Sequence, residues 1–258
     1  MGDGTGNQPS PDNFVTYDMV DKDLQVTSTN TSTNLNANAN TLGPFVSGRV
    51  SYNGTVYVST WGHHGILIAV GGPQDTSQGR RANRTKTNNA ENFQTIHVYD
   101  IRNARWYEQQ SSGDIPETRQ DFCMAGSPSS NRTHEILVYA GWNGQPGPGA
   151  IPYDSAYVLT LPGFFWVKAN YTAAHPRHGL TCEAVGGSQI LTIGGVDSTQ
   201  QKDPNTNDTY TPGFNTRDPF PQGLAIFDLA SLAWSSSYSA NRGFQPPASQ
   251  IQAYYNTK

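Results

Sequence analysis

The chain has 258 residues, enough for one large domain or two small ones, and its 35% apolar content can support a buried core. Charged residues make up only 14%, and the net charge of -4 comes with no dense basic surface, which argues against a nucleic-acid-binding protein. No apolar run is long enough for a membrane span, and the first ten residues lack the apolar centre of a secretion signal.

The chain begins with a polar stretch and a weak first unit. Residues 1–12 show no apolar periodicity, and we expect them to be disordered. In the segment 13–46, Tyr17-Asp18 is separated from Leu24 by five residues, a spacing that returns later with Trp in place of Leu. We interpret this segment as a degenerate copy of the repeat that follows.

Three further units, at about 47–108, 119–170 and 177–236, share one order of predicted strands. A short strand opens each unit, at 48–52, 122–126 and 180–185, and an apolar strand then ends in a glycine pair or its equivalent. A variable loop, an aromatic strand, a short turn and a tryptophan strand complete the unit. The positions that define the repeat are Gly71, Gly72, Tyr99, Asp100, Trp106, Gly141, Trp166, Gly194, Gly195, Asp228 and Trp234. No helix is predicted, and 237–258 is expected to be a polar tail.

A unit of four antiparallel strands cannot bury both of its faces alone. We therefore expect an all-β fold in which the units stack around an axis as the blades of a propeller. The glycine pair ends an inner strand, where backbones crowd together. The tryptophan lies on an outer strand and fills the widening space between blades. The aspartates of the repeat are expected to accept backbone N–H groups in the next turn.

The order of glycine pair, Tyr-Asp, turn and Trp, with Arg119 and Arg177 before an inner strand, resembles the kelch repeat over residues 13–236. The long polar loops and low charge are similar to the extracellular or membrane-anchored kelch proteins of filamentous fungi. That resemblance implies a location at the cell surface. Kelch propellers close with more blades than the three and a fraction counted here, so we expect a fragment without its N-terminal blades. A self-associating half-propeller is the alternative.

Long connections gather at one edge of the predicted blades, at 73–94, 143–154 and 196–222. Loops of this length are often functional, and the kelch resemblance implies peptide binding at this edge. The candidate partner-binding residues there are Arg119, Asp121, Trp142, Arg177 and His178. In the alternative interpretation, these residues only cap strands and pair locally.

The sequence contains no pattern that indicates catalysis. Copper radical oxidases share the fold, but their ligand pattern is absent, and neighbouring His63 and His64 would point to opposite faces of a strand. His134-Glu135 lacks the second histidine of the zinc protease motif. We therefore expect no catalytic residue, no metal and no cofactor, and keep the remnant of a copper oxidase as an alternative.

Cys123 and Cys182 are the only cysteines, and both fall in inner strands that converge near the axis. They could form one disulfide or remain buried thiols. Acceptor patterns for N-glycosylation occur at Asn30, Asn53, Asn83, Asn131, Asn170 and Asn207.

Together these features predict a recognition module that binds a protein or peptide partner at the cell surface. A propeller that binds cell-wall glycans is an alternative, because Trp61 and Trp142 could stack on sugars.

Overall fold

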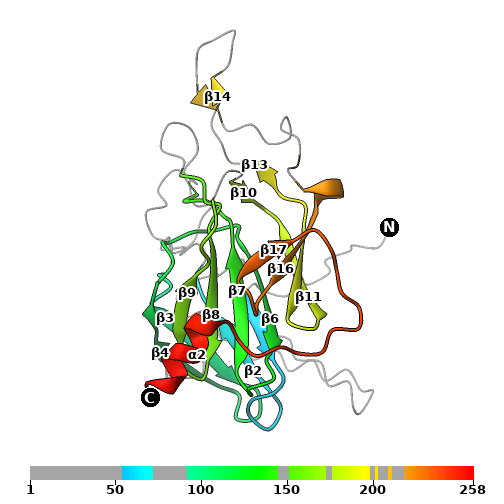
Figure 1. The fold of residues 1–258 in the computed structure, drawn as a ribbon. Helices are drawn as coiled ribbons and strands as arrows, with labels where there is room; N and C mark the ends of the chain where they lie inside the picture. The colour runs from blue at the N-terminus through cyan, green and yellow to red at the C-terminus, as the bar shows by residue number, and fades with distance from the viewer. Residues whose placement is uncertain are drawn as a thin grey trace, which may run out of the picture.

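The computed structural model describes residues 54–71, 92–144, 151–172, 176–196, 218 and 220–258, and the backbone alone of 197, 201–202 and 209–210. Three sheets, each built on four antiparallel strands, dominate this part of the chain (Figure 1). They confirm the predicted all-β fold of four-stranded antiparallel blades. The predicted segments 1–12 and 13–46 lie outside the described residues.

The first sheet has the order β1-β2-β3-β4. Its strands are β1 (Thr55–Val58), β2 (Ile66–Ala69), β3 (Thr95–Asp100) and β4 (Arg105–Gln110). The innermost described strand of this sheet is β1, and the predicted strand at 48–52 lies outside the described residues. In β1 the alternate residues Val56 and Val58 are buried, because pairing with β2 turns them toward the core.

The second sheet has the order β5-β9-β8-β7-β6. Its strands are β5 (Ser112–Gly113), β6 (Cys123–Pro128), β7 (His134–Tyr139), β8 (Ala156–Leu161) and β9 (Phe165–Lys168). The short strand β5 comes from the connection after the first blade and pairs in parallel with β9. Every residue of β7 and β8 is buried, because both faces of this sheet are covered.

The third sheet has the order β11-β12-β16-β17. Its strands are β11 (Thr181–Gly186), β12 (Gln189–Ile193), β16 (Leu224–Asp228) and β17 (Ala233–Ser235). Shorter elements lie in its connections: β10 (Arg177–His178) pairs with β13 (Val196–Asp197), β14 (Gln201–Lys202) pairs with β15 (Thr209–Tyr210), and the 3-10 helix η4 (Pro221–Gly223) precedes β16.

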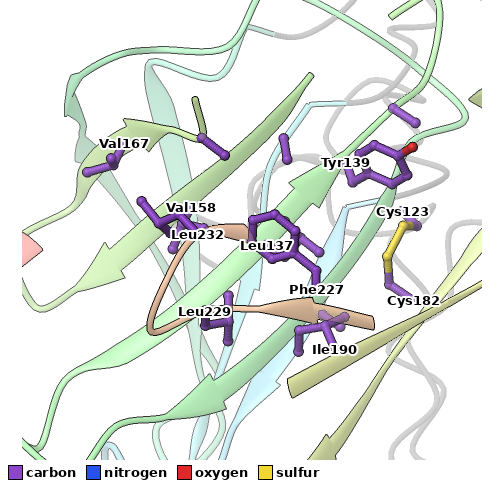
Figure 2. Close-up of a cluster of buried hydrophobic side chains, with 14 of the residues drawn as sticks. Cys123, Leu137, Tyr139, Val158, Val167, Cys182, Ile190, Phe227, Leu229 and Leu232 are labelled. Carbon is purple, nitrogen blue, oxygen red and sulfur yellow. A yellow bond between two sulfur atoms is a disulfide. The ribbon is translucent and has the colours of Figure 1, made fainter. Parts of the chain in front are cut away.

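Two apolar clusters hold the sheets together. Neighbouring residues of β7 point to opposite faces of the second sheet. Ile136 packs in the first cluster, which lies between the first and second sheets, and Leu137 packs in the second cluster, which lies between the second and third sheets. Figure 2 shows the second cluster, where Phe227 and Ile190 lie below Leu137. The second blade is therefore the middle of three stacked blades.

A disulfide joins Cys123 of β6 to Cys182 of β11, with their Cα atoms 5.3 Å apart (Figure 2). It links the inner strands of the second and third blades across 59 residues of sequence.

The tryptophans of the repeat lie on the outer strands. Trp166 is fully buried in the cluster between the first and second sheets, and its Nε1 donates to the Phe93 carbonyl oxygen at 3.2 Å. Trp234 packs against Tyr139 of the second sheet, with ring centroids 4.6 Å apart. Trp106 packs against Tyr99 of the neighbouring strand, with ring centroids 5.0 Å apart and planes inclined by 45°.

The aspartates and glycines of the repeat shape its turns. Asp100 accepts the Asn103 backbone N–H at 3.1 Å, and Asp228 accepts that of Ala230 at 2.9 Å. Gly71, Gly141, Gly194 and Gly195 all have positive φ angles, which favour glycine. Gly72 lies outside the described residues.

The C-terminal segment is packed against the blades and is not the polar tail that the sequence predicted. It runs from the third blade to the second and ends in the helix α2 (Ser249–Asn256), shown in red in Figure 1. Ile251 of this helix is fully buried in the second cluster, and Tyr254 stacks on Phe165 with ring centroids 4.2 Å apart. We call residues 237–258 the C-terminal strap.

Candidate functional site

One edge of the blades carries the long connections, and we call it the loop edge. There β7 and β12 end and β6 and β11 begin, and the short strands β10 and β13 lie beside them (Figure 1). The helix α2 lies at the opposite edge, among short turns. Much of the predicted loop surface, including 73–91 and 145–150, lies outside the described residues.

Three of the predicted residues meet at the loop edge. The Trp142 indole Nε1 donates a hydrogen bond to Asp121 Oδ2 at 2.7 Å. The same indole ring stacks on the His178 imidazole, with centroids 5.0 Å apart and planes inclined by 24°. Asp121, Trp142 and His178 are each partly exposed, and we call them the Trp142 cluster.

The backbone around the cluster is tightly connected. Trp142 forms isolated bridges with Gln120 on one side and Pro152 on the other. Gly141 precedes it at φ +95°, and a Cβ there would come within 2.8 Å of the Gln120 carbonyl oxygen. Asp121 itself has φ +55°, a left-handed conformation that is uncommon outside glycine. These constraints fix the position of the Trp142 indole relative to the Asp121 carboxylate.

Arg119 is not part of an exposed surface, because its side chain is fully buried. Its guanidinium donates to the Ala140 carbonyl oxygen at 3.1 Å and to Glu117 Oε2 at 2.8 Å. It also lies over the rings of Tyr153 and Tyr157, at 4.2 and 5.2 Å from their centroids. Arg119 therefore fits the alternative interpretation, in which it only pairs locally, and it fastens the start of the second blade.

Arg177 is likewise only 4% exposed. Its Nη1 donates to the Gly195 carbonyl oxygen at 2.9 Å and forms an ion pair with Asp218 at 3.2 Å. The two arginines therefore occupy corresponding places in successive blades without meeting each other. Both arginines were predicted to share a binding surface with Asp121, Trp142 and His178, but only the last three lie together at the surface.

Sequence reasoning missed the partners that bury these arginines. Tyr157 lies 40 residues from Glu117 in the chain, yet its hydroxyl donates to Glu117 Oε2 at 2.9 Å. The spacing of Glu117 and Arg119, two residues apart, was the only local signal. Sequence reasoning also missed Ile151, which is 53% exposed and whose backbone pairs with Asn143 beside the cluster.

The cluster offers a carboxylate, an indole and an imidazole on a rigid backbone. Such groups can accept hydrogen bonds and present flat rings to a peptide. Among the described residues, no group of three His, Cys, Asp or Glu side chains is arranged to hold a metal ion. His63 and His64 lie in the turn after β1, at the opposite edge, with ring centroids 6.1 Å apart.

Trp61 is one of the two aromatic residues predicted to stack on sugars in the glycan-binding alternative. It lies in the turn after β1 and packs against the first apolar cluster, so part of its surface is covered by core residues. Trp142 has one ring face against His178. Within the described part of the chain, no helix is both long and apolar enough to cross a membrane.

Stacked four-stranded antiparallel sheets, with tryptophans of the outer strands in or beside the clusters between them, fit a kelch-type propeller. Comparison with known proteins agrees. The chain is 28% identical over 192 residues to a "Kelch repeat-containing protein" of the filamentous fungus Arthroderma benhamiae. This match covers 73% of the chain but only 24% of the relative, so the chain spans about a quarter of that protein. No model of a protein family matches the chain.

A solved structure is also similar to the chain: a fungal alcohol oxidase of the AA5 family in complex with copper. The two are 12% identical, with 72% of this chain and 31% of that chain covered, and the TM-score is 0.34. A likeness of this size supports no inference about chemistry.

Proposed function

We propose that the chain is a non-catalytic recognition module that binds a protein or peptide partner through the loop edge, and that it works outside the cell. The observation that carries the proposal is the Trp142 cluster. An aromatic ring, an imidazole and a carboxylate lie together at the surface, on the edge from which the long connections project.

The rigid backbone beneath the cluster supports this role. Binding energy concentrates in a few residues that are already fixed before the partner arrives, and Trp is among the most frequent of them. Exposed Ile151 adds apolar area close by. The two buried arginines contribute indirectly, because they fix the strand ends from which Asp121 and His178 project.

The proposed extracellular location is supported by the disulfide. Structural disulfides form and persist in oxidising compartments. The surface is also poor in charge, with 14% charged residues, and the similar protein from a filamentous fungus carries kelch repeats. The proposal assigns no metal or cofactor to the chain.

The direct test is selection of binding peptides from a random library on the intact chain, followed by affinity measurement with single variants. We expect Trp142→Ala and His178→Ala to weaken the selected peptides by about tenfold or more, a typical loss at a central aromatic residue. His63→Ala, at the opposite edge, is the matched control for His178→Ala and should leave binding unchanged.

Two outcomes would contradict the proposal: no peptide is enriched, or the enriched peptides ignore both cluster variants. A glycan array run in parallel distinguishes the sugar-binding alternative, and copper analysis of the purified chain distinguishes the oxidase alternative.

A further inference from the structure

A pocket of about 380 Å³ lies at the edge opposite the loop edge. Its walls come from three places: the turn between β6 and β7, the turn after β8, and the C-terminal strap. The residues that line it are Asn131, Arg132, Thr133, Pro162, Pro247, Gln252, Tyr255 and Asn256. The volume is within the range of small-ligand sites.

One wall of the pocket is an N-glycosylation acceptor. Asn131 belongs to the sequence Asn131-Arg132-Thr133 and lies exposed at the tip of the turn. Its Oδ1 accepts only a long hydrogen bond, 3.5 Å, from Ser130 Oγ. Within the described residues, its amide nitrogen has no hydrogen-bond partner. The nitrogen to which a sugar would be joined is therefore unengaged beside a pocket.

The lining suits the first sugar of an N-linked glycan. Pro162, Pro247 and the ring of Tyr255 provide apolar surface for the carbon face of a pyranose. The Gln252 Nε2 already donates to the Pro247 carbonyl oxygen at 2.6 Å, so its Oε1 and the Asn256 amide are the groups that can bond to hydroxyls and to an acetamide.

The state of Thr133 determines when a sugar could be attached. In the folded chain its hydroxyl is buried, 2.7 Å from Ser129 Oγ and 2.6 Å from Glu135 Oε1, to which it donates. The acceptor sequence is therefore accessible only before this turn folds. The second described acceptor differs, because Asn170 and Thr172 are both exposed and neither lines the pocket.

We propose that Asn131 is glycosylated during synthesis, and that its first N-acetylglucosamine then lies in the pocket and fastens the strap to the second blade. In this step the Asn131 amide nitrogen forms a bond to the anomeric carbon of a lipid-diphosphate-linked oligosaccharide. The bond from that carbon to the diphosphate breaks, the lipid diphosphate leaves, and the amide loses one proton. The inference rests on the proposed extracellular function, since only chains that enter the secretory pathway meet this donor.

The test is to secrete the chain from a yeast host with an added leader and to map sugars at Asn131 and Asn170 by mass spectrometry. Peptide N-glycosidase is then applied to the folded and to the denatured chain. We expect Asn131 to be occupied and its glycan to be released at least tenfold more slowly than that of Asn170 from the folded chain. After denaturation, the two rates should be equal.

Matched variants of α2 sharpen this test. Asn256→Ala removes a residue of the pocket and should speed release from Asn131, whereas exposed Gln250→Ala, outside the pocket, should not. An unmodified Asn131 in the secreted chain, or equal release from both sites in the folded chain, would overturn the inference. Because peptide binding is measured with unglycosylated protein from bacteria, failure here is distinguishable from failure of the proposed function.

Discussion

His134 and Glu135 are neighbours on β7, and both are buried, at 3% and 2% exposure. Within the described residues, neither imidazole nitrogen of His134 has a hydrogen-bond partner, and burial lowers its pKa to about 4. Burial raises the pKa of Glu135 to about 7, although the Thr133 and Thr160 hydroxyls donate to its carboxyl group. The two shifts act on stability in opposite directions.

The native pKa of His134 lies below its unfolded value of 6.5, so its contribution is complete above pH 6.5 and is lost as the pH falls through about 4. The native pKa of Glu135 lies above its unfolded value of 4.5, so its contribution is complete below pH 4.5 and is lost as the pH rises through about 7. Between pH 4.5 and 6.5 the two slopes cancel.

Glu135→Gln should remove this cancellation while keeping an acceptor for the Thr133 hydroxyl. We expect the free energy of unfolding, relative to the native sequence, to rise by about 3 kcal/mol as the pH goes from 4.5 to 7, because the contribution that Glu135 loses over this range is absent from the variant. Urea unfolding of both chains at several pH values measures the difference.

His134→Leu is the mirror variant. It removes two unpartnered nitrogen atoms and should leave the Glu135 dependence, so stability should fall between pH 4.5 and 7. If the free energy of unfolding changed with pH in the same way for the native chain and both variants, burial would not shift the pKa values of His134 and Glu135.

At the scale of the element, the C-terminal strap closes the edge opposite the proposed binding face. Gln245 connects two blades, because its carbonyl oxygen accepts from the Ser130 N–H at 3.0 Å and its N–H donates to Ser188 Oγ at 3.0 Å. The Tyr255 hydroxyl accepts the Gly163 N–H at 2.9 Å. The strap thus stabilises the second and third blades together.

Ile251→Ala tests the strap, because this side chain is fully buried in the cluster between the two blades. We expect a loss of about 2–5 kcal/mol, the usual cost of such a truncation in a core. Thermal unfolding measures it, with exposed Gln250→Ala on the same helix as the control. Equal midpoints for the two variants would show that the strap contributes little.

The elements differ in how far the sequence predicts them. The glycine pair, the Tyr-Asp pair and the Trp each mark one strand, and they recur in the same order. The order of strands in each blade could therefore be predicted from the sequence. The helix α2 was missed because it has no side-chain cap and only one buried residue, Ile251. At the site, the burial of Arg119 depends on Tyr157, a contact that no local pattern can show.

At the scale of the whole molecule, three stacked blades have two outer faces. On the third sheet, Ile193 and Leu224 are register partners on the face opposite the core, at 40% and 41% exposure. On the first sheet, Tyr57 of β1 also faces away from the core and is 54% exposed. Such apolar faces on a propeller blade are normally covered by the next blade. We therefore expect another sheet to cover each of these faces.

The central claim is that the described residues form three blades of a kelch-type propeller with apolar side chains exposed on both outer faces. Sedimentation velocity of the purified 258-residue chain, over a range of concentrations, tests it most directly. We predict association that increases with concentration and is weakened by Ile193→Asp but not by Ile151→Asp, an equally drastic change at the loop edge. A monomer at every concentration, with a single cooperative unfolding transition, would contradict the claim.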